Sequence, residues 1–208
     1  MGPSSSPSDD EVSSPGFPLP GLVITLAVTA FLTFLLATPD GLLTKADMVG
    51  YAVCHRIATH SFIIAGRQLP LCARCTGTFL GALLGFFGQA VVLRRNGAAQ
   101  FPPFQILIVL FGGTLLWATD GLNSYLALIH LPHLYQPRNW LRLTTGALNG
   151  LMMSALIYPI FNFTLWRSPL SERTIRNLRD LGTLLLLEAG MVGLVLTRWP
   201  FLLYPLAI

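Results

Sequence analysis

Long apolar runs, separated by short polar stretches, extend along most of this chain. The first, about residues 20–37, holds no charged residue, and roughly 18 helical residues at 1.5 Å each nearly match a hydrocarbon core about 30 Å thick. Further runs of the same character cover about residues 75–93, 104–119, 146–165 and 181–198. This pattern predicts an all-α integral membrane bundle of about five transmembrane helices.

Two segments depart from the apolar pattern. Residues 1–18 are rich in Ser and Pro and carry acidic but no basic residues, so they have neither a packable core nor the charged start of a signal peptide. They predict a disordered tail, followed by a single membrane domain over residues 19–208. Residues 44–54 begin with capping-box spacing and keep helical apolar intervals, but they are too polar to span. They predict a short interfacial helix.

The composition agrees with a membrane location. Hydrophobic residues make up 53% of the 208 residues and charged residues 11%, against about 25% charged in a typical soluble domain, so a water-facing surface cannot be built. The net charge of +4 comes almost entirely from arginine, which suits buried ion pairs and lipid phosphates. No basic stripe is interleaved with aromatic residues. Membrane lipids are therefore expected partners, and nucleic acid is not.

All the cysteines lie within residues 51–77, together with two of the four histidines. Cys72 and Cys75, with two residues between them, stand just before a predicted helix, so both can bind one ion as thiolates, and the helix N-terminus favours the anionic form. Cys54 and His55 can complete a tetrahedral set, which matches structural zinc chemistry in ligand type and number. The segment therefore predicts a site for zinc or another transition metal.

Two other interpretations of these cysteines remain open. Free cysteines are often buried and chemically inert, so the thiols can simply pack among helices. A Cys-x-x-Cys pair at a helix N-terminus is also the arrangement of dithiol oxidoreductases, in which Cys54 would resolve a mixed disulfide. A c-type haem is disfavoured, because Cys75 is followed by Thr76 and not by histidine. No nucleotide cofactor is expected.

Four ionisable residues form a second group of candidates. Asp120 and Arg142 stand at the ends of apolar spans, where an ionisable group is costly unless partnered, and an ion pair between them is expected. Such a pair would either fix two helices or handle a substrate or proton. Arg74 lies between the two later cysteines and is expected to serve the site. Glu188 lies inside an apolar run, where a lone carboxylate is either protonated or paired.

Glycines recur every four residues on two predicted spans, at Gly77, Gly81 and Gly85 and again at Gly146 and Gly150. Small residues at this spacing allow a neighbouring helix to approach closely inside a membrane. The pattern predicts helix packing, either within the chain or in a homo-oligomer.

Two blocks of residues also form a recognisable signature: Cys54-His55, Ser61-Phe62, Gly66, the segment from Leu69 to Gly77, Gly81, Asp120-Gly121, Asn139, Arg142 and Thr145-Gly146. They resemble a family of uncharacterised prokaryotic membrane proteins, domain of unknown function 2085, over about residues 50–150. The resemblance implies a prokaryotic cell membrane and brings no known activity. In that family's pattern arginine replaces His60, which makes His55 the better ligand candidate.

These observations give a leading hypothesis and two rivals. We expect a multi-pass membrane protein in which Cys54, His55, Cys72 and Cys75 hold a zinc-like ion that clamps the first interhelical loop. The first rival is a membrane thiol oxidoreductase. The second is a small transporter or channel with a polar path through Asp120, Arg142 and Glu188, although no internal repeat supports it.

Overall fold

The computed structural model describes residues 19–37 and 41–207, so the predicted tail, residues 1–18, lies outside the described residues. Contacts divide the chain at Gly41 into two units, and each is described by itself. The first contains helix α1, Leu19–Ala37, which has no charged residue. A single membrane domain over residues 19–208 stays a prediction.

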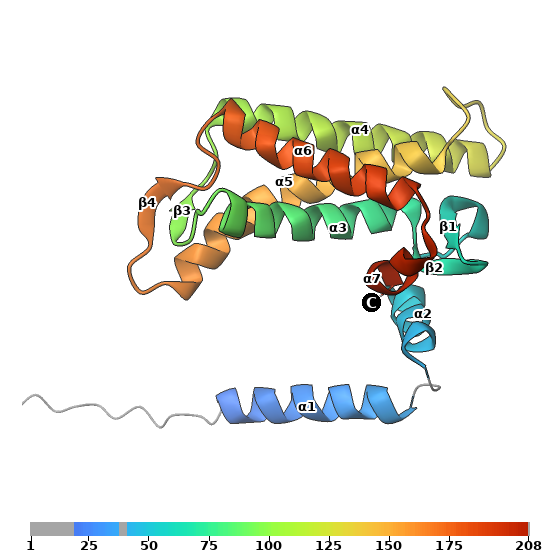
Figure 1. Cartoon of the computed structure of the whole chain (residues 1–208), viewed down its shortest axis with the longest axis horizontal. Helices are drawn as coiled ribbons and strands as arrows, with labels where there is room; N and C mark the ends of the chain where they lie inside the picture. Colours follow the sequence, from blue (N-terminus) through green and yellow to red (C-terminus); the bar gives the residue numbers. More distant parts are fainter. Residues whose placement is uncertain (1–18, 38–40, 208) are drawn as a thin grey trace, which may run out of the picture. The chain divides into compact units, whose positions relative to one another are not determined.

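The second unit is built around four long helices. Its elements, in chain order, are α2 (Leu42–Val53), η1 (Ala58–His60), β1 (Ser61–Ile64), β2 (Arg67–Cys72), α3 (Ala73–Phe87), η2 (Gly88–Val92), β3 (Ala98–Gln100), α4 (Phe104–Leu128), α5 (Asn139–Leu165), β4 (Leu170–Arg173), α6 (Leu178–Leu196), η3 (Pro200–Leu202) and α7 (Leu203–Ala207). Helices α3 to α6 lie side by side, with α5 in contact with the other three. The strands lie at the ends of this bundle (Figure 1).

The predicted all-α membrane bundle is confirmed, and the number of spans lies between three and five. Within the described residues, three helical segments are long and apolar enough to cross a membrane by themselves: Ala73–Val92, Phe104–Leu128 and Asn139–Leu165. Two bent helix pairs, α1 with α2 and α6 with the C-terminal helix, qualify only if each pair is counted as one span. Helix α6 falls short alone because three of its 19 residues are charged.

Close packing of α3 on α5 forms the centre of the bundle. A Cβ atom added at Gly81 would lie 2.5 Å from the carbonyl oxygen of Ala147, and Gly77 meets the backbone of α5 just as closely. Gly146 and Gly150 present the same bare backbone to α3 in return. The predicted close approach is thus confirmed within one chain, and homo-oligomerisation stays a prediction.

Two helix boundaries differ from those expected. Helix α4 continues to Leu128, nine residues past the predicted end at 119, and α5 begins at Asn139, seven residues before the predicted start at 146. The added turns contain polar residues, which the apolar pattern assigned to loops. Several of these side chains are buried and bonded inside the bundle: the amide of Asn123 bonds the backbone of Leu134 and Tyr135, at 2.7 and 2.8 Å.

A short β-hairpin, which was not predicted, orders the segment before α3. Strands β1 and β2 are antiparallel, and the turn between them uses Ala65 and Gly66 at positive φ, 51° and 75°. Two-residue turns of this kind match the twist of paired strands. Phe62, Ile64 and Leu69 are almost fully buried and belong to the core that also contains residues of α3, α5 and α6. The hairpin therefore fixes the register of Cys72 relative to the bundle.

Candidate functional site

The end of the bundle beside the hairpin brings the cysteines together. Cys54 follows α2, and its amide bonds the carbonyl of Gly50 at 2.9 Å. Cys72 is both the last residue of β2 and the N-cap of α3, and Cys75 lies in the first turn of that helix. One ligand atom from each of Cys54, His55 and Cys72 lies within 4.8 Å of the others. Two segments of the chain, residues 54–55 and the end of β2, thus converge on one point.

Backbone amides support the sulfur atoms. The amide of Cys72 donates to Sγ of Cys54 at 3.2 Å, and the amide of Cys75 donates to Sγ of Cys72 at 3.5 Å. Cys75 is outside the group of three, but its thiol hydrogen-bonds that of Cys72. This bond lowers the pKa of Cys72 to about 5, with further lowering from the Cys75 amide and the Cys54 thiol and opposition from burial. Cys72 is therefore the thiolate of the cluster at neutral pH.

The two histidines of the segment lie against each other but differ in surroundings. The ring of His55 is exposed, and its Nδ1 accepts a hydrogen bond from the amide of Ile57 at 3.1 Å. His60 contacts His55 edge to face at 5.6 Å between ring centroids. Burial, together with the nearby charges of Arg142 and His55, lowers the pKa of His60 to about 4. His60 is therefore neutral at pH 7 and does not belong to the converging group.

A buried ion pair lies directly beside the cysteines. Arg74 pairs with the carboxylate of Asp120 through Nη2, which also donates to the Asp120 carbonyl and to Oγ of Ser124, each at 3.0 Å. The hydroxyl of Tyr135 donates to the same carboxylate at 2.8 Å. Burial and this bond raise the pKa of Tyr135 to about 12, so the hydroxyl keeps its proton. The Asp120 carboxylate thus accepts from α3 and from the loop between α4 and α5.

The prediction that Asp120 pairs with Arg142 is wrong, because Asp120 pairs with Arg74. Arg74, on the first turn of α3, reaches Asp120 on α4, whereas Nη1 of Arg142 donates to the side-chain oxygen of Asn139 at 2.7 Å. Asn139 in turn donates to the carbonyls of Thr59 and Ser61, at 3.1 and 3.2 Å. Arg142 therefore supports the residue that ties α5 to the loop around His60.

Sequence reasoning missed three of these participants: Ser124, Tyr135 and, as a bonded member, Asn139. Ser124 and Tyr135 lie between the predicted spans 104–119 and 146–165, in a stretch that the apolar pattern assigned to a loop. A usable signal was present for Ser124, which follows Asp120 by four residues and so shares its helix face.

Glu188 is apart from this network. It lies in the middle of α6, is 3% exposed, and neither of its carboxylate oxygens has a hydrogen-bond partner among the described residues. Within the same residues, no ion pair or hydrogen bond joins it to Asp120, Arg142 or Arg74. The structure therefore separates Glu188 from the other polar candidates, and a continuous polar path is not seen in the described part of the chain.

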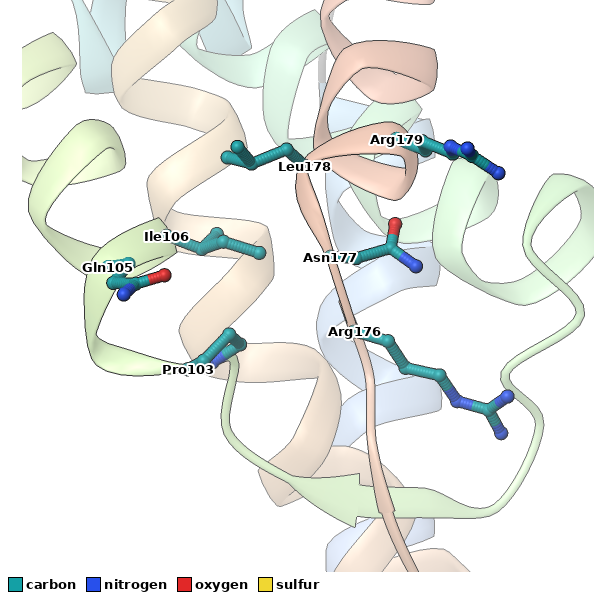
Figure 2. A pocket seen from close by; sticks show the side chains of 7 residues that line it. All are labelled: Pro103, Gln105, Ile106, Arg176, Asn177, Leu178 and Arg179. Atoms are coloured by element: carbon teal, nitrogen blue, oxygen red, sulfur yellow. The ribbon is translucent and has the colours of Figure 1, made fainter.

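The hollow drawn in Figure 2 lies at the far end of the bundle, where α4 and α6 begin. It measures about 440 Å³ and is lined by residues 103–106 and 176–179, though not by Phe104. Figure 2 shows the guanidinium groups of Arg176 and Arg179 pointing away from Gln105 and Pro103. The hollow thus lacks converging polar groups, and the cysteine cluster remains the candidate site.

Comparisons with known proteins agree with this location. Residues 54–156 match the model of a family described as "Predicted membrane protein (DUF2085)". The chain belongs to this family over these residues. The matched part contains the whole cysteine cluster and the Arg74, Asp120 and Arg142 network, whereas Glu188 lies outside it. The family description and the apolar helices together identify an integral membrane protein.

Two archaeal relatives carry no named activity. An uncharacterised protein of Methanocaldococcus jannaschii is 28% identical over 109 residues, which is 52% of this chain and 64% of that protein. An uncharacterised protein of Methanothermobacter thermautotrophicus is 27% identical over 104 residues, 50% of this chain and 83% of that protein. The match thus covers less than two thirds of the first relative's length. No solved structure matches the chain.

Proposed function

We propose that this DUF2085 membrane protein binds a zinc-like metal ion through Cys54, His55, Cys72 and Cys75, and that the ion fastens the loop between α2 and α3 to the start of α3. The observation that carries the proposal is that the ligand atoms of Cys54 and His55, directly after α2, converge on that of Cys72 at the end of β2. Cys75 follows in the first turn of α3. The role is structural and not enzymatic.

The spacing of the ligand atoms suits a tetrahedral ion. Zn–S bonds of about 2.3 Å place two tetrahedral sulfurs about 3.8 Å apart. The ligand atoms of Cys54, His55 and Cys72 lie within 4.8 Å of one another, so binding requires them to close by about 1 Å or less. The amides that donate to Cys54 and Cys72 stabilise thiolates, as hydrogen bonds around metal ligands commonly do. Cys75 supplies the fourth ligand.

Metal binding by His55 requires a local change. Its Nδ1 now accepts a hydrogen bond from the Ile57 amide, which places the ring proton of the neutral imidazole on Nε2. If Nδ1 binds the metal, the ion replaces that amide. If Nε2 binds, the proton must move to Nδ1, which can then no longer accept. In either case the proposal requires the bond between Ile57 and His55 to break on metal binding.

A dithiol function is the second candidate, and the low pKa of Cys72 favours it. A thiolate with the thiol of Cys75 hydrogen-bonded to it is the usual starting arrangement of a Cys-x-x-Cys redox pair. In this alternative the pair interconverts with a disulfide, and Cys54 exchanges with the mixed disulfide. The two functions differ in metal content and in the number of cysteines that must act together.

Metal analysis of the purified protein, combined with a count of free thiols, tests the proposal. We expect one zinc-like ion per chain when chelators are avoided, and its loss in each of the variants Cys54→Ser, Cys72→Ser and Cys75→Ser, because a tetrahedral structural site has no spare ligand. His55→Ala should also lose the ion. His60→Ala is the matched control and should retain it. Metal-free protein with a reversible disulfide between Cys72 and Cys75 would favour the dithiol function instead.

A further inference from the structure

The polar network beside the cysteines contains more positive than negative charge. Arg142 is 4% exposed, and the side chain of Arg74 is 19% exposed. Asp120 is the carboxylate that neutralises Arg74, and among the described residues no carboxylate forms an ion pair with Arg142. The bonded partner of Arg142 is the neutral amide of Asn139, and its Nε is buried without a partner in the described part of the chain. One buried positive charge is therefore left over.

Helix packing places this charge next to the cysteine cluster. The N-terminal parts of α3 and α5 touch, since a Cβ at Gly146 would meet the carbonyl of Arg74 and one at Gly77 would meet that of Leu143. Cys72 caps the N-terminus of α3 at this level. Asp120 and, more weakly, Cys72 lie near enough for a negative charge on either to favour the charged form of Arg142, and Arg142 in turn disfavours a positive charge on His60.

We propose that Arg142 is the counter-charge of the metal–thiolate cluster. Its positive charge favours a metal ion whose ligands give the cluster one net negative charge. The inference rests on the proposed metal-binding function. A divalent ion with three thiolates and one neutral histidine carries one negative charge, which Arg142 balances. A set of two thiolates and two histidines is neutral, as is a disulfide, and either would leave Arg142 unpaired.

The balance matters because Cys72 and Arg142 are both buried, at 3% and 4% exposed. A buried charge without a partner is strongly destabilising, whereas a compensated set of charges is tolerated. Arg142 thus acts on the metal through its charge and not as a ligand. It is a positioning residue, and the identity of the guanidinium group should matter less than its positive charge.

Zinc affinity, measured in detergent by competition with a chromophoric chelator, tests this role. Arg142→Gln should weaken Zn²⁺ binding by about 10 to 100-fold, the usual effect of losing a partner of the metal ligands, while Arg142→Lys should retain most of the affinity. Arg142→Met, an apolar replacement, is the second variant if Arg142→Gln does not fold. Arg95→Gln is the matched control, because Arg95 is a mostly buried arginine paired with Asp180 at the other end. The control should leave Zn²⁺ affinity unchanged.

A double-mutant cycle separates the effect of the Arg142 charge on Zn²⁺ affinity from a nonspecific structural effect of the substitution. Cys75→His makes the ligand set neutral, so it should weaken Zn²⁺ binding more in the parent than in the Arg142→Gln background. The Co²⁺ spectrum should show thiolate bands in Arg142→Gln as in the parent, because the ligands are the same.

Each result decides one proposal. Equal affinity in the parent and Arg142→Gln, equal weakening by Arg142→Lys and Arg142→Gln, or an additive cycle would overturn the role of Arg142 while leaving the metal site in place. A parent protein that binds no Zn²⁺ would overturn the metal site itself, and with it the role of Arg142.

Discussion

Cys72 connects three features of the protein through a single residue. Its backbone ends β2, where it pairs with Ser61, and its side chain caps α3 by accepting from the Cys75 amide. Its own amide donates to Sγ of Cys54. A change in the charge of this sulfur therefore affects the strand β2, the helix α3 and the loop that holds Cys54. This explains how one ion could order a long stretch of chain.

His60 should make the protein sensitive to mild acid. Its folded pKa of about 4 is below the ordinary value of 6.5, so between these values the unfolded state binds more protons and stability is lost as the pH falls. We expect the thermal unfolding midpoint of chelator-treated protein to be lower at pH 4 than at pH 7. This decrease should be larger in the parent than in His60→Gln. Cys72 also titrates near this range, but it does so in both proteins. Parallel curves would contradict the assignment.

Breaking the Arg74–Asp120 pair should strongly destabilise the protein. Asp120→Asn leaves a largely buried guanidinium without its carboxylate, so the free energy of unfolding in detergent should fall by about 3–5 kcal/mol. The control is Arg176→Gln, which removes the exposed pair with Glu172 and should cost about 0–1 kcal/mol. If the two variants lose similar stability, Asp120 is more solvated than its 1% exposure indicates.

The local part of the site could be predicted from the sequence, and the long-range part could not. Cys72 and Cys75 lie one helical turn apart at a helix start, so their proximity follows from spacing alone. The partner of Asp120 depends on how α3 and α4 both pack on α5, since Arg74 and Asp120 are 46 residues apart in the chain. By charge alone, either Arg74 or Arg142 could pair with Asp120, and only the packing of the helices decides which one does.

At the level of helices, the polar residues of α4 and α5 explain why their boundaries were placed wrongly. An apolar span was expected to stop where polar residues appear, yet Asn123 and Asn139 lie inside or at the start of helices and bond loop backbone. In a bundle the interior can be the polar side, because the lipid-facing side must be apolar. The apolar pattern therefore located the helices but underestimated their length.

The α3–α5 contact gives a sharp test of helix packing. Gly81→Leu would push a side chain into the backbone of Ala147, which cannot move without separating the two helices, so we expect a loss of about 1–3 kcal/mol in detergent. Leu83→Phe on the exposed face of the same helix is the control and should have little effect. A Gly81→Leu protein with the thermal stability of the parent would show that the helices are not packed this closely.

Considered as a whole, the second unit has two unlike ends. The hairpin, η3 and α7 lie at the end with the cysteine cluster, and β3 and β4 lie at the other, where the long helices turn (Figure 1). The arginines are divided between both ends, which makes the charge bias for orientation weak. The arginines of the cluster end include those that bond Asp47 and Asp120, so they serve structure. Most of the remaining loop arginines lie at the other end, which predicts that this end faces the cytosol.

The side on which the C-terminus lies decides whether α6 crosses the membrane. Five spans place residues 44–75 and the C-terminus on one side of the membrane, opposite residues 167–180. Reporter fusions at Asn96, Arg138, Arg173 and the C-terminus should then alternate sides. The first three must alternate if Phe104–Leu128 and Asn139–Leu165 both cross, as their length and composition indicate. Helix α6 is the doubtful element, because it carries Glu188 in its middle and bends by 115° into the C-terminal helix. A C-terminal fusion on the same side as Arg173 would show that α6 does not cross, and Glu188 would then lie at the membrane surface and not within it.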